Sequence, residues 1–205
     1  MRYYMLSKPM DKICAVRDPR HRVVMECIAE GERAGLYPVG RLDKDTEGLL
    51  ILTDDGEFTN KVLSPSSNIS KTYLFYAKGE LTPEKIAYLE SPHTVLGGRE
   101  FDSSGARVEV ISRLTMRDAK RLLIRENQEK LEHTKRGDIL LTEAKITISE
   151  GKKHQVKRML LGVGCEIVYL KRLSIGALAL DETLAPGEYR PLTSEEIALA
   201  LRSDK

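Results

Sequence analysis

The sequence predicts an α+β fold, because short β-forming runs and helical stretches follow one another without a regular strand–helix–strand period. Its 205 residues are enough for one domain, or for two small lobes around a cleft, with a sizeable hydrophobic core. Hydrophobic residues make up 41% of the chain, yet none of its apolar runs reaches the length that spans a membrane. We therefore expect a globular chain that is not embedded in a membrane.

Five segments have the composition of strands, being short and rich in β-branched, aromatic or aliphatic residues. They are residues 3–7, 49–53, 71–78, 106–111 and 139–149. The first is stopped by Pro9, which has no N–H to donate to a ladder. The second, residues 49–53, is a short apolar run of the kind that buried strands show.

Helices are expected at residues 22–30, 57–63 and 83–90. The third has Thr82 as a good N-cap and Pro83 in the first turn. Asp54-Asp55-Gly56 is a turn signal, so we interpret its carboxylates as turn chemistry rather than catalysis. Residues 115–135 are charged and helical in propensity, and a solvated surface element is favoured there.

The formal net charge of +2 does not by itself indicate a nucleic-acid partner, but positive charge is gathered locally. One basic cluster comprises Lys152, Lys153, His154, Lys157 and Arg158, and a second comprises Lys171 and Arg172. With eight tyrosines, three phenylalanines and no tryptophan, the chain has fewer aromatic side chains than a protein that binds single strands mainly by stacking.

Cysteine and histidine spacing does not indicate a metal site. Cys14, Cys27 and Cys165 are unevenly spaced without a CxxC pair, which suits free thiols in a reducing cytoplasm. The four histidines make no zinc pattern, so metal catalysis is not expected. Residues 1–9 are too short and too polar for a signal peptide, so we expect a cytoplasmic protein.

The most informative segment is residues 40–48, which reads Gly-Arg-Leu-Asp-Lys-Asp-Thr-Glu-Gly. It holds Asp43 between two glycines, just before the predicted strand at residues 49–53. A carboxylate that the scaffold fixes and a ligand can reach is what a nucleophile or general base requires. The alternative is that Asp43, Asp45 and Thr46 are ordinary loop residues that bond their own backbone.

A second informative segment is residues 149–160, which the apolar spacing predicts to contain a helix. Positions i, i+3, i+4 and i+7 of its core stripe are Val156, Met159, Leu160 and Val163. The other side gathers His154, Lys157 and Arg158, with Gln155 near the boundary. Gly151 before the helix would let an anion approach free N–H groups. The face is either a solvated surface or an RNA-backbone or active-site face.

A third segment is Lys71-Thr72-Tyr73 at the start of a predicted strand. A tyrosine on a strand is usually a core residue or a cross-strand partner. Tyr73 could instead form the floor of a base pocket, with its hydroxyl at the reacting sugar.

Together these segments resemble the RsuA-type branch of the pseudouridine synthases, which modify ribosomal RNA. The matching segments follow the family's order from near residue 2 to near residue 200. They are Lys8-Pro9, Gly40-Arg41-Leu42-Asp43 through Asp54-Asp55-Gly56, Lys71-Thr72-Tyr73, Glu150-Gly151, His154-Gln155-Val156-Lys157-Arg158-Met159, Leu170-Lys171-Arg172, Ile175-Gly176, and residues 184–193.

The resemblance implies the pseudouridine synthase fold, with a mixed, mainly antiparallel sheet flanked by helices and two lobes around a central active-site cleft. It implies a single catalytic domain over residues 1–205, with Asp43 as the catalytic carboxylate. Lys157 takes the position of the cation beside Asp43, where many relatives in other branches carry arginine. Tyr73 maps to the tyrosine that stacks under the target uracil. The reaction consumes neither a cofactor nor a metal.

The resemblance also implies an RNA partner, either ribosomal RNA or a ribosomal assembly intermediate. A monomer is the default expectation. A uridine inside folded RNA must be flipped into the pocket. We expect the flanking backbone to be held by Lys8, Arg41, His154, Gln155, Arg158, Lys171 and Arg172.

Two features depart from the branch. Many members begin with a small S4-type RNA-binding domain, whereas this sequence starts directly at the first predicted strand, so no S4 domain is expected. Residues 112–138 look longer than the usual connection and are a possible helical insertion that could partly replace that domain.

Several functions stay open. Residues 147–151 and Lys157 look more like small-subunit than large-subunit ribosomal enzymes, so a 16S-type target is expected and a large-subunit target is the alternative. A catalytically silent RNA-binding or ribosome-assembly factor is a second alternative. A retaining glycosidase using Asp43 and Asp45 fits poorly, because aromatic sugar platforms are missing.

Overall fold

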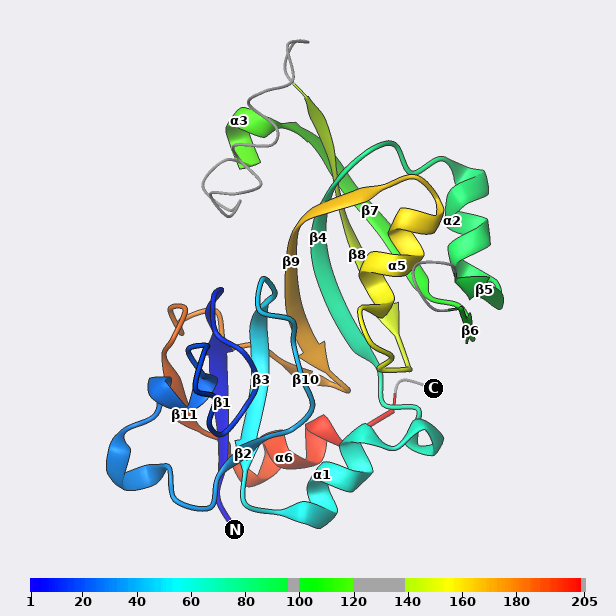
Figure 1. Ribbon diagram of the computed structural model, residues 1–205. Helices are drawn as coiled ribbons and strands as arrows, with labels where there is room; N and C mark the ends of the chain where they lie inside the picture. The colour runs from blue at the N-terminus through cyan, green and yellow to red at the C-terminus, as the bar shows by residue number, and fades with distance from the viewer. Residues whose placement is uncertain (96–99, 120–138, 204–205) are drawn as a thin grey trace. The chain divides into compact units, whose positions relative to one another are not determined.

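The computed structural model describes residues 1–95, 100–119 and 139–203 (Figure 1). The chain forms two compact units. Unit 1 comprises Met1–Lys71 and Lys171–Lys205, and unit 2 comprises Thr72–Leu170. Among the described residues, the helices are too short or too polar to cross a membrane.

Unit 1 is built on strands in the order β11-β1-β3-β9. Their bounds are Tyr189–Pro191 for β11, Tyr3–Lys8 for β1, Glu47–Thr53 for β3 and Glu166–Ile175 for β9, which enters from unit 2. β1 is antiparallel to β11 and β3, whereas β3 and β9 are parallel, with Glu47 opposite Lys171 and Gly48 opposite Arg172. Two-residue strands β2 (Tyr37–Pro38) and β10 (Leu178–Ala179) pair with β3 and β9.

The core of unit 1 lies on both faces of β3, whose residues Leu49 to Leu52 are all fully buried. Helices α1 (Gly56–Leu63) and α6 (Ser194–Ala200) pack on one face. Asp55 caps α1, its carboxylate accepting hydrogen bonds from the N–H groups of the second and third helical residues at 2.9 and 3.1 Å. The same carboxylate accepts the Tyr3 hydroxyl, and this bond raises the pKa of Tyr3 to about 12. The Asp55 carboxylate therefore makes local turn and helix-capping hydrogen bonds, as expected.

Unit 2 continues the strand order as β9-β4-β8-β7. Its elements are β4 (Lys71–Lys78), β7 (Arg107–Thr115), β8 (Leu140–Ile148), a β5–β6 hairpin (His93–Val95 and Phe101–Ser103), and helices α2 (Pro83–Glu90), α3 (Met116–Ala119) and α5 (Gln155–Gly162). β7 and β8 are antiparallel over their whole length, with an irregularity between Val110 and Ser112. Figure 1 shows α2 and α5 beside these strands, where Leu89 and Met159 are fully buried.

The α+β fold with a mixed, mostly antiparallel sheet is confirmed, and so are the five predicted strands and the helices at residues 57–63 and 83–90. The helix predicted at residues 22–30 is wrong. That stretch forms two short 3-10 segments, Val24–Cys27 and Glu30–Glu32. β-branched Val23 and Val24 disfavour a regular helix, and Val23 instead forms a bridge with Ile13.

Further differences concern the extent of β7 and elements that were not predicted. β7 extends to Thr115, so residues 112–115 of the expected helical insertion are strand, and Met116–Ala119 is a short helix. The rest of that prediction, residues 120–138, lies outside the described residues. Strand β9 and helix α6 were not predicted, although Thr193 and Glu196 form a capping box.

Candidate functional site

Asp43 lies in unit 1, on the loop that leads into β3, and is half-buried between exposed and buried neighbours. Glycines bound this loop because the backbone requires them. Gly40 and Gly48 have φ angles of 77° and 106°, which side chains rarely adopt. A Cβ at Gly48 would overlap the backbone of Arg172 on β9, coming within 2.7 Å of its nitrogen. The close parallel pairing of β3 with β9 thus fixes the end of the Asp43 loop.

Lys8 holds this loop from inside the unit. Its side chain is fully buried, and its ammonium group donates to the carbonyl oxygens of Pro9 at 2.9 Å, Thr46 at 2.8 Å and Lys44 at 3.4 Å. Burial lowers the pKa of Lys8, while the neighbouring thiol of Cys14 and acidic side chains including Asp43 oppose that shift. Lys8 therefore holds the backbone just after Asp43, at Lys44 and Thr46. This buried position does not favour the direct RNA contact expected for Lys8.

Cys14 contributes a second anchor, because its sulfur accepts a hydrogen bond from the Leu42 N–H at 3.2 Å. Burial raises the pKa of the Cys14 thiol, and this hydrogen bond opposes the rise. Sequence reasoning identified Cys14 only as a free thiol. No local pattern could have linked it to Leu42, since the two residues are 28 positions apart.

Arg172 is the next buried cation, only 4% exposed. Its Nε donates to the Leu49 carbonyl oxygen at 2.8 Å, while its Nη2 is buried and makes no hydrogen bond among the described residues. Lys71 is also buried, donating to the Ile69 carbonyl oxygen at 2.7 Å, and burial together with the charge of Arg172 lowers its pKa to about 8. Like Lys8, Arg172 is placed to brace β3 rather than to lie along an RNA backbone.

Arg41 and Lys171 are placed differently. Arg41 is exposed two positions before Asp43, and Lys171 is half-buried on β9 beside the first residue of β3. Neither side chain makes a hydrogen bond or ion pair to the part of the chain that the structure describes. Unit 1 therefore has two positively charged side chains available to an external ligand, Arg41 on the Asp43 loop and Lys171 on β9.

Tyr73 lies in unit 2 on β4, on the same face as Phe75 and Ala77, and is 9% exposed. Its hydroxyl makes no hydrogen bond within the described ranges 1–95, 100–119 and 139–203. Thr72 points to the opposite face, where its hydroxyl lies 2.9 Å from that of Thr147 on β8. The local placement fits both a core tyrosine and a tyrosine that keeps its hydroxyl for a ligand.

The entry to α5 is held by a side-chain network. Gln155, 3% exposed, donates from its amide to Glu150 at 2.6 Å and accepts the Lys152 N–H at 3.0 Å. The other oxygen of Glu150 accepts the Ser104 N–H at 3.0 Å. Gln155 thus ties the loop to α5 and to the chain after β6, so its burial does not favour the RNA contact expected for it.

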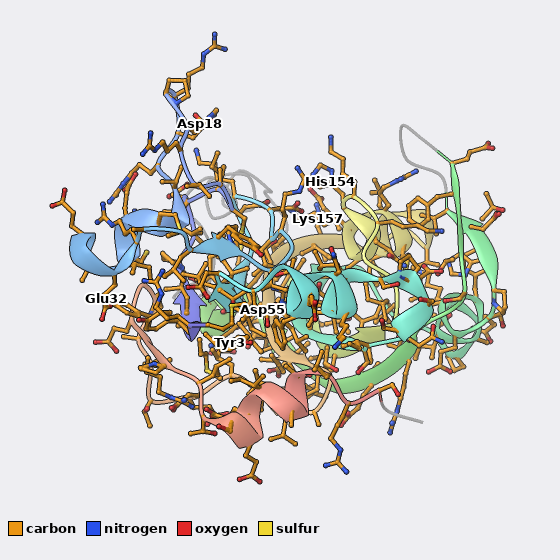
Figure 2. The ribbon with its side chains drawn as sticks, turned by 90° about the horizontal axis from the view of Figure 1, so that it is seen from below. Tyr3, Asp18, Glu32, Asp55, His154 and Lys157 are labelled. Atoms are coloured by element: carbon orange, nitrogen blue, oxygen red, sulfur yellow. The ribbon has the colours of Figure 1, made fainter. Side chains whose placement is uncertain are left out.

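His154 immediately precedes α5, and Lys157 lies in the first turn of that helix (Figure 2). His154 is exposed and takes the left-handed conformation, with φ of 53°, so it precedes the helix rather than lying on its polar face. Lys157 is half-buried inside the helix. The predicted core stripe is confirmed for Val156, Met159 and Leu160, all at least 95% buried.

Arg158 packs against the β5–β6 hairpin. Its guanidinium lies 4.1 Å from the ring centre of Phe101, and Lys152 approaches the same ring at 5.1 Å. This stacking holds Arg158 within unit 2. The structure thus places Asp43, Lys8, Arg41, Lys171 and Arg172 in unit 1, and Tyr73, His154, Gln155, Lys157 and Arg158 in unit 2.

Comparisons with known proteins are consistent along the chain. Residues 2–161 match the family model described as RNA pseudouridylate synthase. The chain is 39% identical over 198 residues to an uncharacterized RNA pseudouridine synthase of Bacillus subtilis, covering 96% of this chain and 72% of that protein. It is 39% identical over 197 residues to the ribosomal small subunit pseudouridine synthase A of Salmonella typhimurium, covering 96% and 73%. A crystal structure of a pseudouridylate synthase superposes with a TM-score of 0.77 at 31% identity, covering 97% and 73%.

Proposed function

Because this chain belongs to the RNA pseudouridylate synthase family, we propose that it converts a specific uridine of small-subunit ribosomal RNA to pseudouridine, with Asp43 as the catalytic carboxylate. Pseudouridine synthesis itself follows from the family and from relatives that are 38–39% identical over 96% of the chain. The small-subunit target is supported by the name of the Salmonella and Escherichia coli relatives.

The chemistry explains why a fixed carboxylate is useful. The bond between C1′ of the ribose and N1 of uracil breaks, the base turns, and C1′ joins C5. The proton on C5 leaves and N1 ends protonated, so the reaction is redox-neutral and no atoms are gained or lost. A carboxylate can attack C1′ as a nucleophile or remove a sugar proton as a base. The observation that best supports Asp43 is its half-buried loop, anchored by Lys8, Cys14 and the β3–β9 pairing.

We propose that two residues of unit 2, Tyr73 and Lys157, support the reaction at Asp43. Tyr73 is proposed to stack against the target uracil. Its hydroxyl, which makes no hydrogen bond within the described residues, is proposed to contact the sugar. Lys157 is proposed to supply the positive charge that keeps the Asp43 carboxylate ionised during the reaction. Its placement in the first turn of α5, which Gln155 and Glu150 brace, supports this assignment.

RNA contacts are proposed for the accessible polar side chains, namely Arg41, Lys171 and His154. We propose bracing roles for Lys8, Arg172, Gln155 and Arg158, whose polar groups bond or stack within their own unit. We further propose that the enzyme works in the cytoplasm as a monomer on ribosomal RNA or an assembling ribosomal particle.

The test uses ribosomal RNA carrying tritium at C5 of its uracils, because only isomerisation at C5 releases that label. Wild type should release tritium, and mapping should place the product in the small-subunit RNA. Asp43→Asn should lose about 10²–10⁴-fold or more of the rate. Asp45→Asn, two positions away on the exposed part of the same loop, is the matched control and should stay near wild type.

Three outcomes would contradict parts of the proposal. Activity of Asp43→Asn equal to wild type removes Asp43 from the chemistry. Pseudouridine found in large-subunit RNA instead would show that the small-subunit target is wrong. RNA binding without tritium release from any ribosomal RNA would favour a silent assembly factor.

A further inference from the structure

Unit 1 contains an open pocket of about 580 Å³, formed by Val16, Arg17 and the chain between Val23 and Tyr37. Its floor is apolar, because Val23, Met25 and Leu36 line it and are at least 92% buried. Arg17, Glu30 and Arg33 also line it, and all three retain solvent exposure. The volume of this pocket, its apolar floor and its few polar groups lie within the range of small-molecule sites.

The pocket is joined to the Asp43 loop by one stretch of chain, residues 11–15. On one side of this stretch, the Asp11 N–H donates to Lys44 and Cys14 accepts from Leu42. On the other side, Ile13 exchanges hydrogen bonds with Arg22 and Val24, each at 3.0 Å. Residues 11–15 therefore lie between the Asp43 loop and the Val23 edge of the pocket. Figure 2 shows Asp18 on the loop that follows this stretch.

Two cations at the pocket are not neutralised by carboxylates. Arg17 makes no side-chain hydrogen bond or ion pair to any described residue. Arg33 donates only to carbonyl oxygens, to Ile28 at 2.7 Å and to Glu26 at 3.5 Å. The Glu26 carboxylate is already paired with Lys12 at 2.6 Å and with Arg22 at 3.1 Å. The pocket therefore presents two guanidinium groups to an anion.

Glu30 is the remaining charged group, and its carboxylate has no hydrogen-bond or ion-pair partner in the described chain. A carboxylate accepts hydrogen bonds from N–H groups and repels carbonyl oxygens. Adenine, cytosine and guanine all present amino groups on their base-pairing edges. Uracil presents one N–H between two carbonyl oxygens, so a carboxylate disfavours it.

We propose that this pocket binds a nucleotide of the substrate RNA next to the target uridine and selects a base that carries an amino group. The apolar floor takes the base, Glu30 accepts from its amino edge, and Arg17 and Arg33 contact the adjoining phosphates. This inference rests on the proposed function and adds a specificity-determining subsite to it.

The base preference is tested with RNAs in which each nucleotide flanking the target is changed singly to uridine. At one position that carries an amino base, the change should lower kcat/KM of the wild type about 5-fold or more, the cost of losing one good base contact. Glu30→Gln should reduce this discrimination, because an amide can pair with uracil as well. Glu195→Gln, an exposed carboxylate outside the pocket, should keep the wild-type preference.

The phosphate contact is tested by RNA affinity against salt. Arg17→Gln should lower the slope of log affinity against log salt by about 1, equally for all flanking sequences. Arg202→Gln removes an exposed arginine of the same unit outside the pocket and should leave the slope unchanged.

The outcomes separate the two proposals. If wild type makes pseudouridine but no flanking position depends on Glu30 and Arg17→Gln keeps the full slope, the pocket inference is overturned and the proposed function stands. If no pseudouridine forms at all, the proposed function fails. In that case the salt slope and the base preference of equilibrium binding still decide whether the pocket holds a nucleotide.

Discussion

The Asp43 loop of unit 1 and the entry to α5 in unit 2 are positioned by different kinds of contact. Backbone groups of the Asp43 loop take part in its anchoring, since its carbonyl groups accept from the buried Lys8 side chain and its end lies against β9. The α5 entry is held by side chains, since Glu150 and Gln155 link it to neighbouring backbone groups. Backbone contacts constrain which residue types a loop can contain, whereas a side-chain network fails when one member is removed.

The largest effect that follows from this comparison is at Gly48. Gly48→Ala should destabilise the protein by about 3 kcal/mol or more, because the new Cβ meets the Arg172 backbone at a φ that disfavours alanine. Denaturant unfolding measures the change. Gly151→Ala is the matched control from the α5 entry, where a Cβ meets nothing within 4 Å, and it should shift stability by less than about 0.5 kcal/mol. Equal stabilities of the two variants would contradict the distinction between the regions.

An intermediate effect is expected at Gln155. Gln155→Ala removes the amide between Glu150 and the Lys152 N–H, and leaving buried polar groups unpaired costs about 1–3 kcal/mol. Hydrogen exchange should show faster exchange at Ser104 and in the first turn of α5, with the Asp43 loop unchanged. Lys153→Ala, two positions earlier and exposed, is the control and should leave exchange as in wild type. Uniformly faster exchange would show that the network is not local.

The smallest effect concerns pH and the buried cations of unit 1. The pKa of Lys71 is about 8 in the folded protein against 10.5 for the free side chain. Between these values the unfolded state binds more protons, so the contribution of Lys71 makes stability rise with pH. From pH 8 to 9.5 the rise should be on the order of 1 kcal/mol relative to Lys71→Met, which lacks the titrating group. Parallel stability curves for wild type and this variant would contradict the burial of a charged Lys71.

Local signals in the sequence predicted strands β1, β3, β4, β7 and β8 and helices α1, α2 and α5, but not how distant residues meet. Thr82 with Pro83 marks a helix start that the structure confirms. Strand β9 carries mixed charged and apolar residues, and its place is set by pairing with strands that are distant in the sequence, such as β3. Residues 22–30 have helical composition, but contacts with Ile13 favour a different path.

The candidate site shows the same limit. The Asp43 segment was identified from its glycines and its position before a buried strand, and the structure places it as a fixed, half-buried loop. The expected RNA contacts were assigned from the family resemblance without regard to burial, which does not separate Lys8, fully buried beside carbonyl groups, from exposed Arg41. Burial depends on tertiary packing, so it could not be predicted from the local sequence.

Unit 1 is assembled from the first 71 residues of the chain and a return segment that starts at Lys171. During synthesis the 99 residues of unit 2, from 72 to 170, are made between these parts, which takes roughly 5–20 s at about 5–20 residues per second. Until β9 and β11 emerge, β3 and β1 each lack one neighbour, and the apolar run from Leu49 to Leu52 is incompletely covered. The segment that carries Asp43 is therefore translated before unit 2 but is fixed in place only after unit 2 has been made, which exposes the nascent chain to aggregation in the interval.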